Sequence, residues 1–458
     1  MAVLLLFYCF CRESIFEDMN GNGNQDNSVT PFAITDYRDI KKLFGIKQKN
    51  RRGHMYLIGK TGTGKSTLIE NMAISDIKDG HGVGLIDPHG DLAERILDFI
   101  PENRLNDVVY INPGDLEYPI AFNPLEKVSR DNHHLVVSGL ISVFKKIWPD
   151  FWGPRLEHIL RHSLLTLMEY PQSTMLDIPK LLTDREFRTR ALRYVTQPQV
   201  RDFWLSEFEK YSAWLKSEAI SPILNKIGQF LTSMPLRNIT GQKENTFNLR
   251  EVMDQGKILI VNLSKGRIGE DNCALLGAMI ITKIQLAALS RSDIPESQRR
   301  SFYFYVDEIH NFLTLSFADI LSESRKYGLS LIMAHQYISQ LDEEIRSAIF
   351  GNVGTIISFR VGAEDAKYLV QEFTPMFDET DLINLPNFRI YLKLMIDGAT
   401  SKPFTAMTLL PAQNPNFLKD EVIRLSREKY TKPRAIVERE INYSAANPNS
   451  FYDQKHLF

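Results

Sequence analysis

Cysteine is scarce in this sequence, and so is net charge. The 458 residues contain three cysteines, Cys9, Cys11 and Cys273. Three are too few for a disulfide framework and are typical of a protein in a reducing cytosol. The formal net charge is −2. The chain is therefore not a polycation, and any contact with nucleic acid has to come from local basic patches.

Long apolar runs are also lacking. The N-terminal run from Ala2 to Cys11 has ten residues, whereas a membrane-spanning helix needs about 20. This run also lacks the basic segment that opens a signal peptide. We found no other run long enough and free enough of charge to span a membrane. The sequence therefore predicts no integral membrane segment, and a location in the cytoplasm or peripherally at the inner face of the cell membrane.

Alternating strand and helix signals dominate most of the chain. Short apolar runs separated by helical patterns predict an α/β protein with a mostly parallel sheet covered by helices on both faces. The predicted strands cover residues 55–58, 83–86, 108–111, 258–263, 302–306, 329–334, 355–359 and 390–395.

The pattern becomes helical throughout between residues 126 and 240. Four helices are predicted there, at 132–147, 154–169, 184–196 and 212–231, and this segment holds all four tryptophans. We expect the tryptophans to pack the interior of an all-α domain inserted into the sheet domain. The predicted domains are a flexible leader at 1–35, a first part of the sheet domain at 36–125, the insertion at 126–240, a second part of the sheet domain at 241–411, and a C-terminal helix with a tail at 412–458.

A glycine-rich turn follows the first predicted strand. The stretch GKTGTGKS, from Gly59 to Ser66, matches the phosphate-binding pattern G-x-x-x-x-G-K-[ST]. Its glycines let consecutive main-chain N–H groups point at phosphate oxygens, and the following helix adds its positive end. Lys65 is expected at the β- and γ-phosphates and the Ser66 hydroxyl on Mg²⁺. The predicted nucleotide-binding residues are Gly59, Lys60, Thr61, Gly62, Thr63, Gly64, Lys65, Ser66, Thr67 and Asp87.

Acidic residues end two of the predicted strands. Asp307 and Glu308 follow the run FYFYV, where Asp307 can hold Mg²⁺ and Glu308 can take a proton from the attacking water. Asp87 ends the second strand in LIDPHGD. It is predicted beside the phosphates, although a simple turn, with Asp91 as the N-cap of the next helix, is an equal alternative.

Two further polar residues complete the predicted site. Gln336 follows the strand run LSLIMAH and is positioned to sense the γ-phosphate or the water, or else to cap a turn. Arg325 lies 18 residues after Asp307 and is predicted to face outward. It could reach a neighbouring subunit's nucleotide as an arginine finger, or simply form a surface ion pair.

Taken together, these motifs resemble those of the FtsK–HerA superfamily of RecA-like ATPases, and most closely the coupling proteins of type IV secretion (the TraG/TraD type). The resemblance spans residues 37–410 and rests on GKTGTGKST, DPHGD, FYFYVDE and SRKYGLSLIMAHQ, in that order. It implies ATP and Mg²⁺ as cofactors, a homo-hexamer, DNA as substrate, and secretion-channel or relaxosome proteins as partners. It also implies Gln336 as sensor and Arg325 as finger.

The sequence leaves several functions open. The first is an ATP-driven DNA translocase of a conjugative or type IV system, acting on single- or double-stranded DNA. A protein-secretion ATPase, a HerA-like cytosolic helicase and a nucleotide-gated scaffold are the alternatives. DNA contacts have modest support. The arginines Arg185, Arg188, Arg190 and Arg193 cluster on one helix, and Lys265 and Arg267 lie in a candidate pore loop at 262–272. Such an arginine cluster is more often a solvated helix face.

Overall fold

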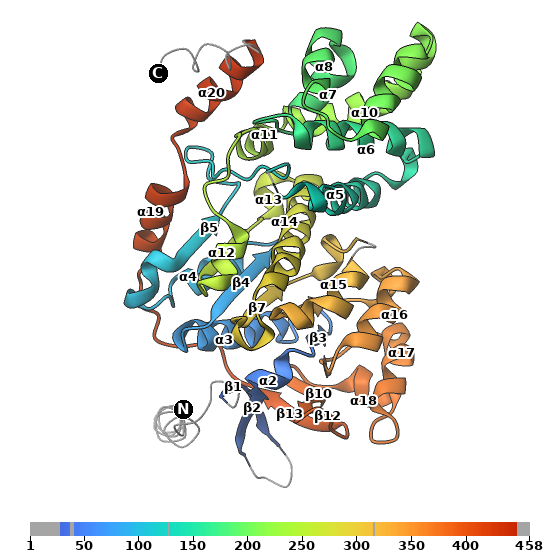
Figure 1. The fold of residues 1–458 in the computed structure, drawn as a ribbon. Coiled ribbons are helices and arrows are strands. Elements are labelled where there is room, and N and C mark those ends of the chain that lie inside the picture. The colour runs from blue at the N-terminus through green and yellow to red at the C-terminus, as the bar shows by residue number, and fades with distance from the viewer. Residues whose placement is uncertain (1–27, 37–40, 127, 315–316, 447–458) are drawn as a thin grey trace. The chain divides into compact units, whose positions relative to one another are not determined.

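A computed structural model describes residues 28–36, 41–126, 128–314 and 317–446 (Figure 1). The chain divides into two compact units. The first consists of Met1–Val83, Ser301–His310 and Leu321–Pro415, and the second of Gly84–Arg300, Asn311–Ile320 and Asn416–Phe458. The chain passes from one unit to the other within β4 (Gly82–Asp87), between Arg300 and Ser301, within η9 (Ile309–Asn311), within α15 (Phe317–Glu323) and after Pro415.

The first unit contains strands in the order β2-β1-β13-β10-β9-β3-β8-β7. Strands β7, β8, β3 and β9 pair in parallel, and β10, β13, β1 and β2 extend them with antiparallel pairs. In β3, β7 and β8 every residue is buried, which explains their almost uninterrupted apolar runs. The bounds are β1 Val29–Thr35, β2 Leu43–Lys47, β3 Met55–Ile58, β7 Phe302–Val306, β8 Leu329–His335, β9 Thr355–Ser358, β10 Arg389–Lys393 and β13 Phe404–Thr408.

Helices and a small hairpin complete this unit. The longest helix, α3, follows β3 and buries most of its residues, among them Leu68 and Met72. The helices are α2 Gln48–Arg51, α3 Lys65–Lys78, η10 Ser324–Tyr327, η11 Ile338–Gln340, α16 Glu343–Asn352, α17 Ala363–Phe373 and α18 Glu379–Asn384, and the hairpin joins β11 Met395–Ile396 to β12 Ala399–Thr400.

The second unit contains β4, β6 (Ile258–Asn262) and β5 (Val108–Ile111), in the order β4-β6-β5. Most of it is helical. Its helices are α4 Asp91–Leu97, α5 His133–Ile147, α6 Pro154–Glu169, α7 Asp177–Thr183, α8 Arg185–Leu192, α9 Pro198–Asp202, α10 Ala213–Thr232, α11 Met234–Thr240, α12 Leu249–Asp254, α13 Lys265–Ile268, α14 Glu270–Ser290, α19 Lys419–Tyr430 and α20 Arg434–Ala446. Single helical turns, among them η5 (Phe203–Glu207) and η7 (Arg291–Asp293), link several of these.

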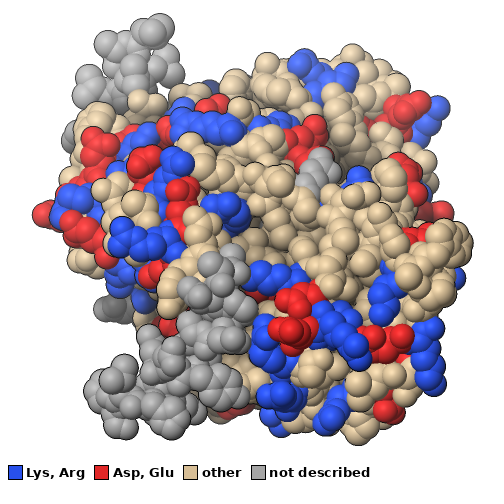
Figure 2. Space-filling model, turned by 90° about the horizontal axis from the view of Figure 1, so that it is seen from above, with Lys and Arg blue, Asp and Glu red and all other residues tan. Residues whose placement is uncertain are grey.

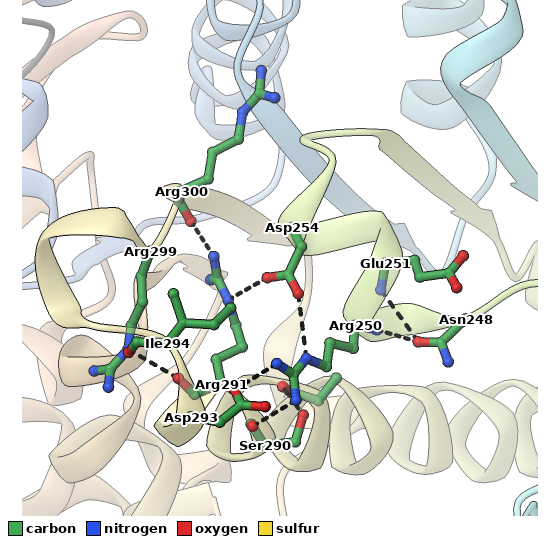
Figure 3. A network of polar contacts seen from close by, with 11 residues as sticks. Asn248, Arg250, Glu251, Asp254, Ser290, Arg291, Asp293, Ile294, Arg299 and Arg300 are labelled. Atoms are coloured by element: carbon green, nitrogen blue, oxygen red, sulfur yellow. Dashed lines mark hydrogen bonds and ion pairs between the residues drawn. The ribbon is translucent and has the colours of Figure 1, made fainter.

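The end of α14 is fixed to α12 by a polar network inside the second unit (Figure 3). Arg291 is fully buried and pairs with Asp254 at 2.8 Å. It also donates to the main-chain oxygen of Arg300 at 2.8 Å. Arg250 contacts the same Asp254 at 3.3 Å and Asp293 at 2.5 Å. These contacts hold the last turn of a long apolar helix in one position.

Most predicted elements lie where the sequence placed them. Strands β3, β5 and β7 and helix α6 have the predicted bounds. The prediction of a flexible leader is wrong for its last residues, because residues 29–35 form β1, which pairs with β13 and β2. Residues 1–27, with the apolar N-terminal run, lie outside the described residues. The prediction of a pore loop at 262–272 is also wrong, because most of these residues form α13 and the start of α14.

One helix passes the test of length and composition that the sequence analysis found no segment to pass. The segment Glu270–Asp293, which contains α14, has a mean hydropathy of 1.7 over its most apolar window and is long enough to cross a membrane by length and composition. However, 67% of that window is buried inside the protein. Such burial is also the property of a core helix, so the hydropathy of α14 does not by itself indicate a membrane span.

The described residues between 126 and 240 form helices joined by turns, with no strand among them. Their helix α5 packs against α14, and the contacts of the chain group them with β4, β6 and β5. The boundaries of a separate inserted domain therefore stay a prediction. Packing by the tryptophans is confirmed for Trp204, which is fully buried and donates to Thr166 at 2.8 Å, but not for Trp214, whose side chain is 73% exposed.

Candidate active site

The glycine-rich turn joins β3 to α3 and has the backbone that only glycine adopts easily. Gly62 has φ +76° and Gly64 has φ +119°, in the region that β-carbon-bearing residues rarely enter. Added at Gly64, a Cβ would lie 2.9 Å from Phe388 and 3.2 Å from the buried Phe359. Added at Gly62, it would meet no heavy atom within 4 Å. The loop is thus packed on one side and open at its tip.

Main-chain hydrogen bonds hold this loop in place. The Lys60 N–H donates to Arg360 O at 2.9 Å, and the Gly59 N–H donates to His335 O at 3.3 Å. The Thr63 hydroxyl donates to Lys60 O at 2.7 Å. Since the first N–H groups of a helix have no intrahelical acceptor, the start of α3 can present its donors to an anion.

Lys65 is the first residue of α3 and is almost fully buried. Its Nζ donates to Gly59 O at 2.5 Å and to Lys60 O at 3.0 Å. Burial lowers the pKa of this amine, and the nearby carboxylates of Asp307 and Glu308 oppose that shift. A phosphate beside it would favour the charged form and satisfy its donors.

The acidic pair ends β7 next to the loop. The Ser66 hydroxyl donates to Asp307 Oδ2 at 2.9 Å. Asp307 and Glu308 are 5% and 6% exposed, so both carboxylates lie in a largely dehydrated environment. Glu308 has φ +44° and its N–H donates to Asp307 Oδ1 at 2.9 Å. A strained backbone at such a residue is frequent at functional sites.

Gln336 connects the loop to the acidic pair. Its amide oxygen accepts from the Thr61 hydroxyl at 3.1 Å, and its amide nitrogen donates to Glu308 Oε1. Of the predicted catalytic residues, the structure therefore brings Lys65, Glu308 and Gln336 together around one loop, with Ser66 and Asp307 beside them. A change at the loop can reach Glu308 through a single side chain.

The two other predicted residues lie differently. Arg325 is exposed in η10, near His54, whose ring contacts Leu321 O at 3.1 Å. This outward position agrees with the sequence prediction. Asp87 is 1% exposed, and its carboxylate accepts the N–H groups of His89 at 2.8 Å and Ala93 at 2.9 Å. Asp87 therefore serves the turn, as the alternative prediction had it, but the cap predicted at Asp91 is wrong, because the N-cap of α4 is Gly90 and Asp91 is the first residue of the helix.

Sequence reasoning missed the aromatic residue at this loop. The Phe388 N–H donates to Thr63 O at 2.9 Å, and its ring lies against Gly64. No local motif marks Phe388, because it reaches the loop only through the return of β10 along the sheet. A turn before a predicted strand was the one available signal.

The candidate DNA contacts are only partly exposed. Arg188 is 4% exposed and pairs with Glu209 at 2.7 Å within the second unit, so it is neither a DNA contact nor part of a solvated face. Arg185 and Arg193 are exposed. Arg267 pairs with Glu94 at 3.6 Å. On the face drawn in Figure 2, basic and acidic side chains are interspersed.

Comparisons with known proteins find solved structures with a similar fold. No curated protein matches the chain. Among solved structures, the bacterial conjugative coupling protein TrwBdeltaN70 is 16% identical with a TM-score of 0.58, covering 88% of this chain and 92% of that one. TrwB with an ATP analogue is 15% identical with a TM-score of 0.61, covering 87% and 92%.

VirB4 of Thermoanaerobacter pseudethanolicus is also similar in structure. It is 15% identical with a TM-score of 0.51, covering 88% of this chain and 99% of that one. These likenesses support the RecA-like fold with its mostly parallel sheet. The sequence itself matches a protein family over residues 39–374. The chain belongs to that family, which is described as the type IV secretion-system coupling protein DNA-binding domain.

Proposed function

We propose that this protein is an ATP-hydrolysing motor that moves DNA for a type IV secretion or conjugative system. The observation that carries the proposal is the cluster at the loop, where Lys65, Ser66, Asp307, Glu308 and Gln336 meet. Solved structures of TrwB hold ADP with Mg²⁺ and an ATP analogue. The membership of the chain in a coupling-protein family supports the same assignment.

The oxygen ligands at the loop fit Mg²⁺ bound to a nucleoside triphosphate. The Ser66 hydroxyl and the Asp307 carboxylate are 2.9 Å apart and supply the hard oxygen ligands that Mg²⁺ prefers. Mg²⁺ bound there would neutralise charge on the β- and γ-phosphates. Lys65 would turn its Nζ from the loop carbonyls to the phosphates, and the N–H groups of Gly62 and Gly64 would cradle them.

Glu308 is the proposed general base. Its carboxylate is largely buried and accepts a hydrogen bond from Gln336, which helps to orient it toward the attacking water. Gln336 also contacts Thr61 at the loop tip. We therefore assign Gln336 the sensor role, in which a change at the loop alters the orientation of Glu308.

The finer parts of the proposal concern assembly and substrate. We propose a homo-hexamer in which the exposed Arg325 completes the site of a neighbouring subunit. DNA is the proposed cargo, relaxosome or secretion-channel proteins are the proposed partners, and the proposed location is cytoplasmic or peripheral at the membrane. A protein-secretion ATPase is the second candidate, and the structural likeness to VirB4 is the observation that favours it.

The test of the motor is an ATPase assay on the full chain with single-stranded DNA, double-stranded DNA or neither. We expect DNA to stimulate turnover, and Glu308→Gln to reduce turnover by about 10²-fold or more while ATP still binds. Lys65→Ala should abolish turnover. ATP hydrolysis that no DNA stimulates would favour the protein-secretion alternative. Normal function of Glu308→Gln in DNA transfer would favour a scaffold.

The shared site needs its own experiment. Arg325→Ala should lose turnover by about 10³-fold and keep ATP affinity. Mixing it with Lys65→Ala should restore part of the activity, because an intact Arg325 from one subunit can meet an intact loop of the next. Full turnover by Arg325→Ala alone, or by a monomer in a mass measurement with ATP, would contradict the arginine finger.

A further inference from the structure

An exposed phenylalanine lies beside the phosphate loop in a strained backbone conformation. Phe388 has φ +64°, in the left-handed region that bulky residues rarely adopt. The residue is nevertheless 37% exposed, so full burial does not explain why the chain keeps a phenylalanine there. Strain of this kind persists where the surroundings fix it, and it often marks a ligand contact.

The surroundings of Phe388 fix both of its main-chain groups. Its N–H donates to Thr63 O at 2.9 Å. Its carbonyl accepts from the Thr408 N–H at 2.8 Å and from the Thr408 hydroxyl at 3.2 Å. The residue is therefore held between the phosphate loop and β13. The ring edge lies against Gly64, where an added Cβ would be 2.9 Å from Cδ1.

A second exposed apolar residue is fixed to the same helix. Leu410 is 59% exposed, and its carbonyl accepts from the Asn71 side chain at 3.0 Å. Gly64, Thr67 and Asn71 are three and four residues apart at the start of α3, so they share one face of the helix. Phe388 is anchored at the beginning of this face and Leu410 at its end, and the half-buried Thr67 lies between them.

From this arrangement we infer that Phe388 is the platform on which the base of the nucleotide stacks, with Leu410 as a second apolar contact. This inference rests on the proposed nucleotide site. The phosphates would accept hydrogen bonds from the N–H groups at the start of α3. The ribose and the base would then have to leave the loop along an exposed surface. An exposed aromatic ring at Gly64 offers a π-face to a purine.

Stacking on an aromatic ring does not depend on the polar edge of the base. The platform should therefore hold ATP and GTP by the same contact. It also gives Phe388 a role in affinity and none in proton transfer. The ring should affect KM far more than kcat, because it binds substrate and transition state alike.

The experiment compares ATP, GTP and inorganic tripolyphosphate, each with Mg²⁺, by calorimetric titration of the full chain. The variant is Phe388→Gly, because glycine adopts the left-handed backbone without strain and so removes the ring while preserving the loop. We expect Kd for ATP and GTP to rise by roughly 5- to 100-fold. Kd for tripolyphosphate, which has no base, should stay unchanged.

Two further variants serve as controls. Phe388→Tyr should restore purine affinity, since it keeps the aromatic face. Tyr368→Ala removes an exposed aromatic residue of α17, which is 45% exposed, and should leave all three affinities unchanged. Unchanged ATP affinity in Phe388→Gly, an equal loss for tripolyphosphate, or a loss confined to one purine would overturn the base platform. If the unmodified chain bound neither ATP nor tripolyphosphate, the phosphate site itself would be refuted, and the base platform with it.

Discussion

Each of the two units has a fully buried arginine in a polar network, and the two networks balance that charge differently. In the first unit, Arg51 pairs at 2.6 Å with Asp76, and both side chains are 0% exposed. In the second unit, Arg291 is equally buried, but its partner Asp254 is 29% exposed. The arginine–aspartate pair is thus fully enclosed in the first unit, whereas in the second unit the aspartate side chain is partly exposed.

The contacts around each arginine differ as well. Arg51 also donates to the Tyr305 hydroxyl at 2.7 Å and lies 3.7 Å from the centre of the Tyr303 ring. Burial acts to lower the pKa of both arginines. At Arg51 the opposing effect of Asp76 and the tyrosines is larger, so the pKa is raised, whereas at Arg291 the effect of burial is larger and the pKa is lowered. A carboxylate enclosed with its arginine compensates a buried charge more completely than one that shares it with water.

The largest predicted effect is the loss of the enclosed carboxylate. Asp76→Ala leaves Arg51 as an unpaired buried charge, which costs about 3–5 kcal/mol of the free energy of unfolding. It also removes an acceptor of Tyr305 on β7, the strand that leads to Asp307. Urea denaturation measures the loss. ATP turnover should fall with it, because α3 and β7 carry the loop and the acidic pair.

A double variant separates charge from packing in this network. Replacing both partners, Arg51→Met with Asp76→Leu, removes the charges together and should cost far less than Asp76→Ala alone. A double variant as unstable as Asp76→Ala would show that the hydrogen bonds to the tyrosines, and not the unpaired charge, determine the cost.

The first unit should also respond to acid through His54. Burial lowers the pKa of His54 to about 4, and its neutral ring contacts Leu321 O at 3.1 Å and accepts from the Leu331 N–H at 3.1 Å. The folded state therefore disfavours the proton. Neutral His54 makes its full contribution to stability above pH 6.5, which is about the pKa of histidine in the unfolded chain. This contribution is lost as the pH falls toward 4.

We expect the free energy of unfolding to drop by about 2 kcal/mol between pH 8 and pH 5 from this group. The measurement is urea denaturation at both pH values. In His54→Asn, which tolerates the φ of +59°, the protein should be less stable at pH 8 but its stability should depend less on pH. An unchanged pH dependence in that variant would assign the acid sensitivity to other groups.

The sequence predicted the elements whose signals are local. The run FYFYV gave β7 with its bounds because every residue in it is buried, and Pro154 opened α6 where proline suits a first turn. Strand β1 was missed because Pro31 interrupts its apolar pattern and because one of its two partners, β13, lies more than 350 residues away. Helix α14 was missed because it is apolar on most sides, which weakens a helical period.

The same division applies to the candidate site. Lys65, Ser66, Asp307, Glu308 and Gln336 were found because motif spacing and strand ends are visible in a sequence. The bridge from Thr61 through Gln336 to Glu308 depends on the order β3-β8-β7 in the sheet, and no local pattern encodes strand order. The contact of Phe388 with Gly64 depends on the return of β10 for the same reason.

The smallest predicted effect tests whether solvent access explains the difference between the two arginines. In Asp254→Ala, Arg291 keeps the carbonyl of Arg300, and Arg250 keeps Asp293 and the carbonyl of Ser290. We therefore expect a loss of about 1 kcal/mol in urea denaturation, with ATP turnover per folded molecule unchanged. A loss equal to that of Asp76→Ala would mean that burial of the arginine alone sets the cost. The exposure of the carboxylate would then not distinguish the two units.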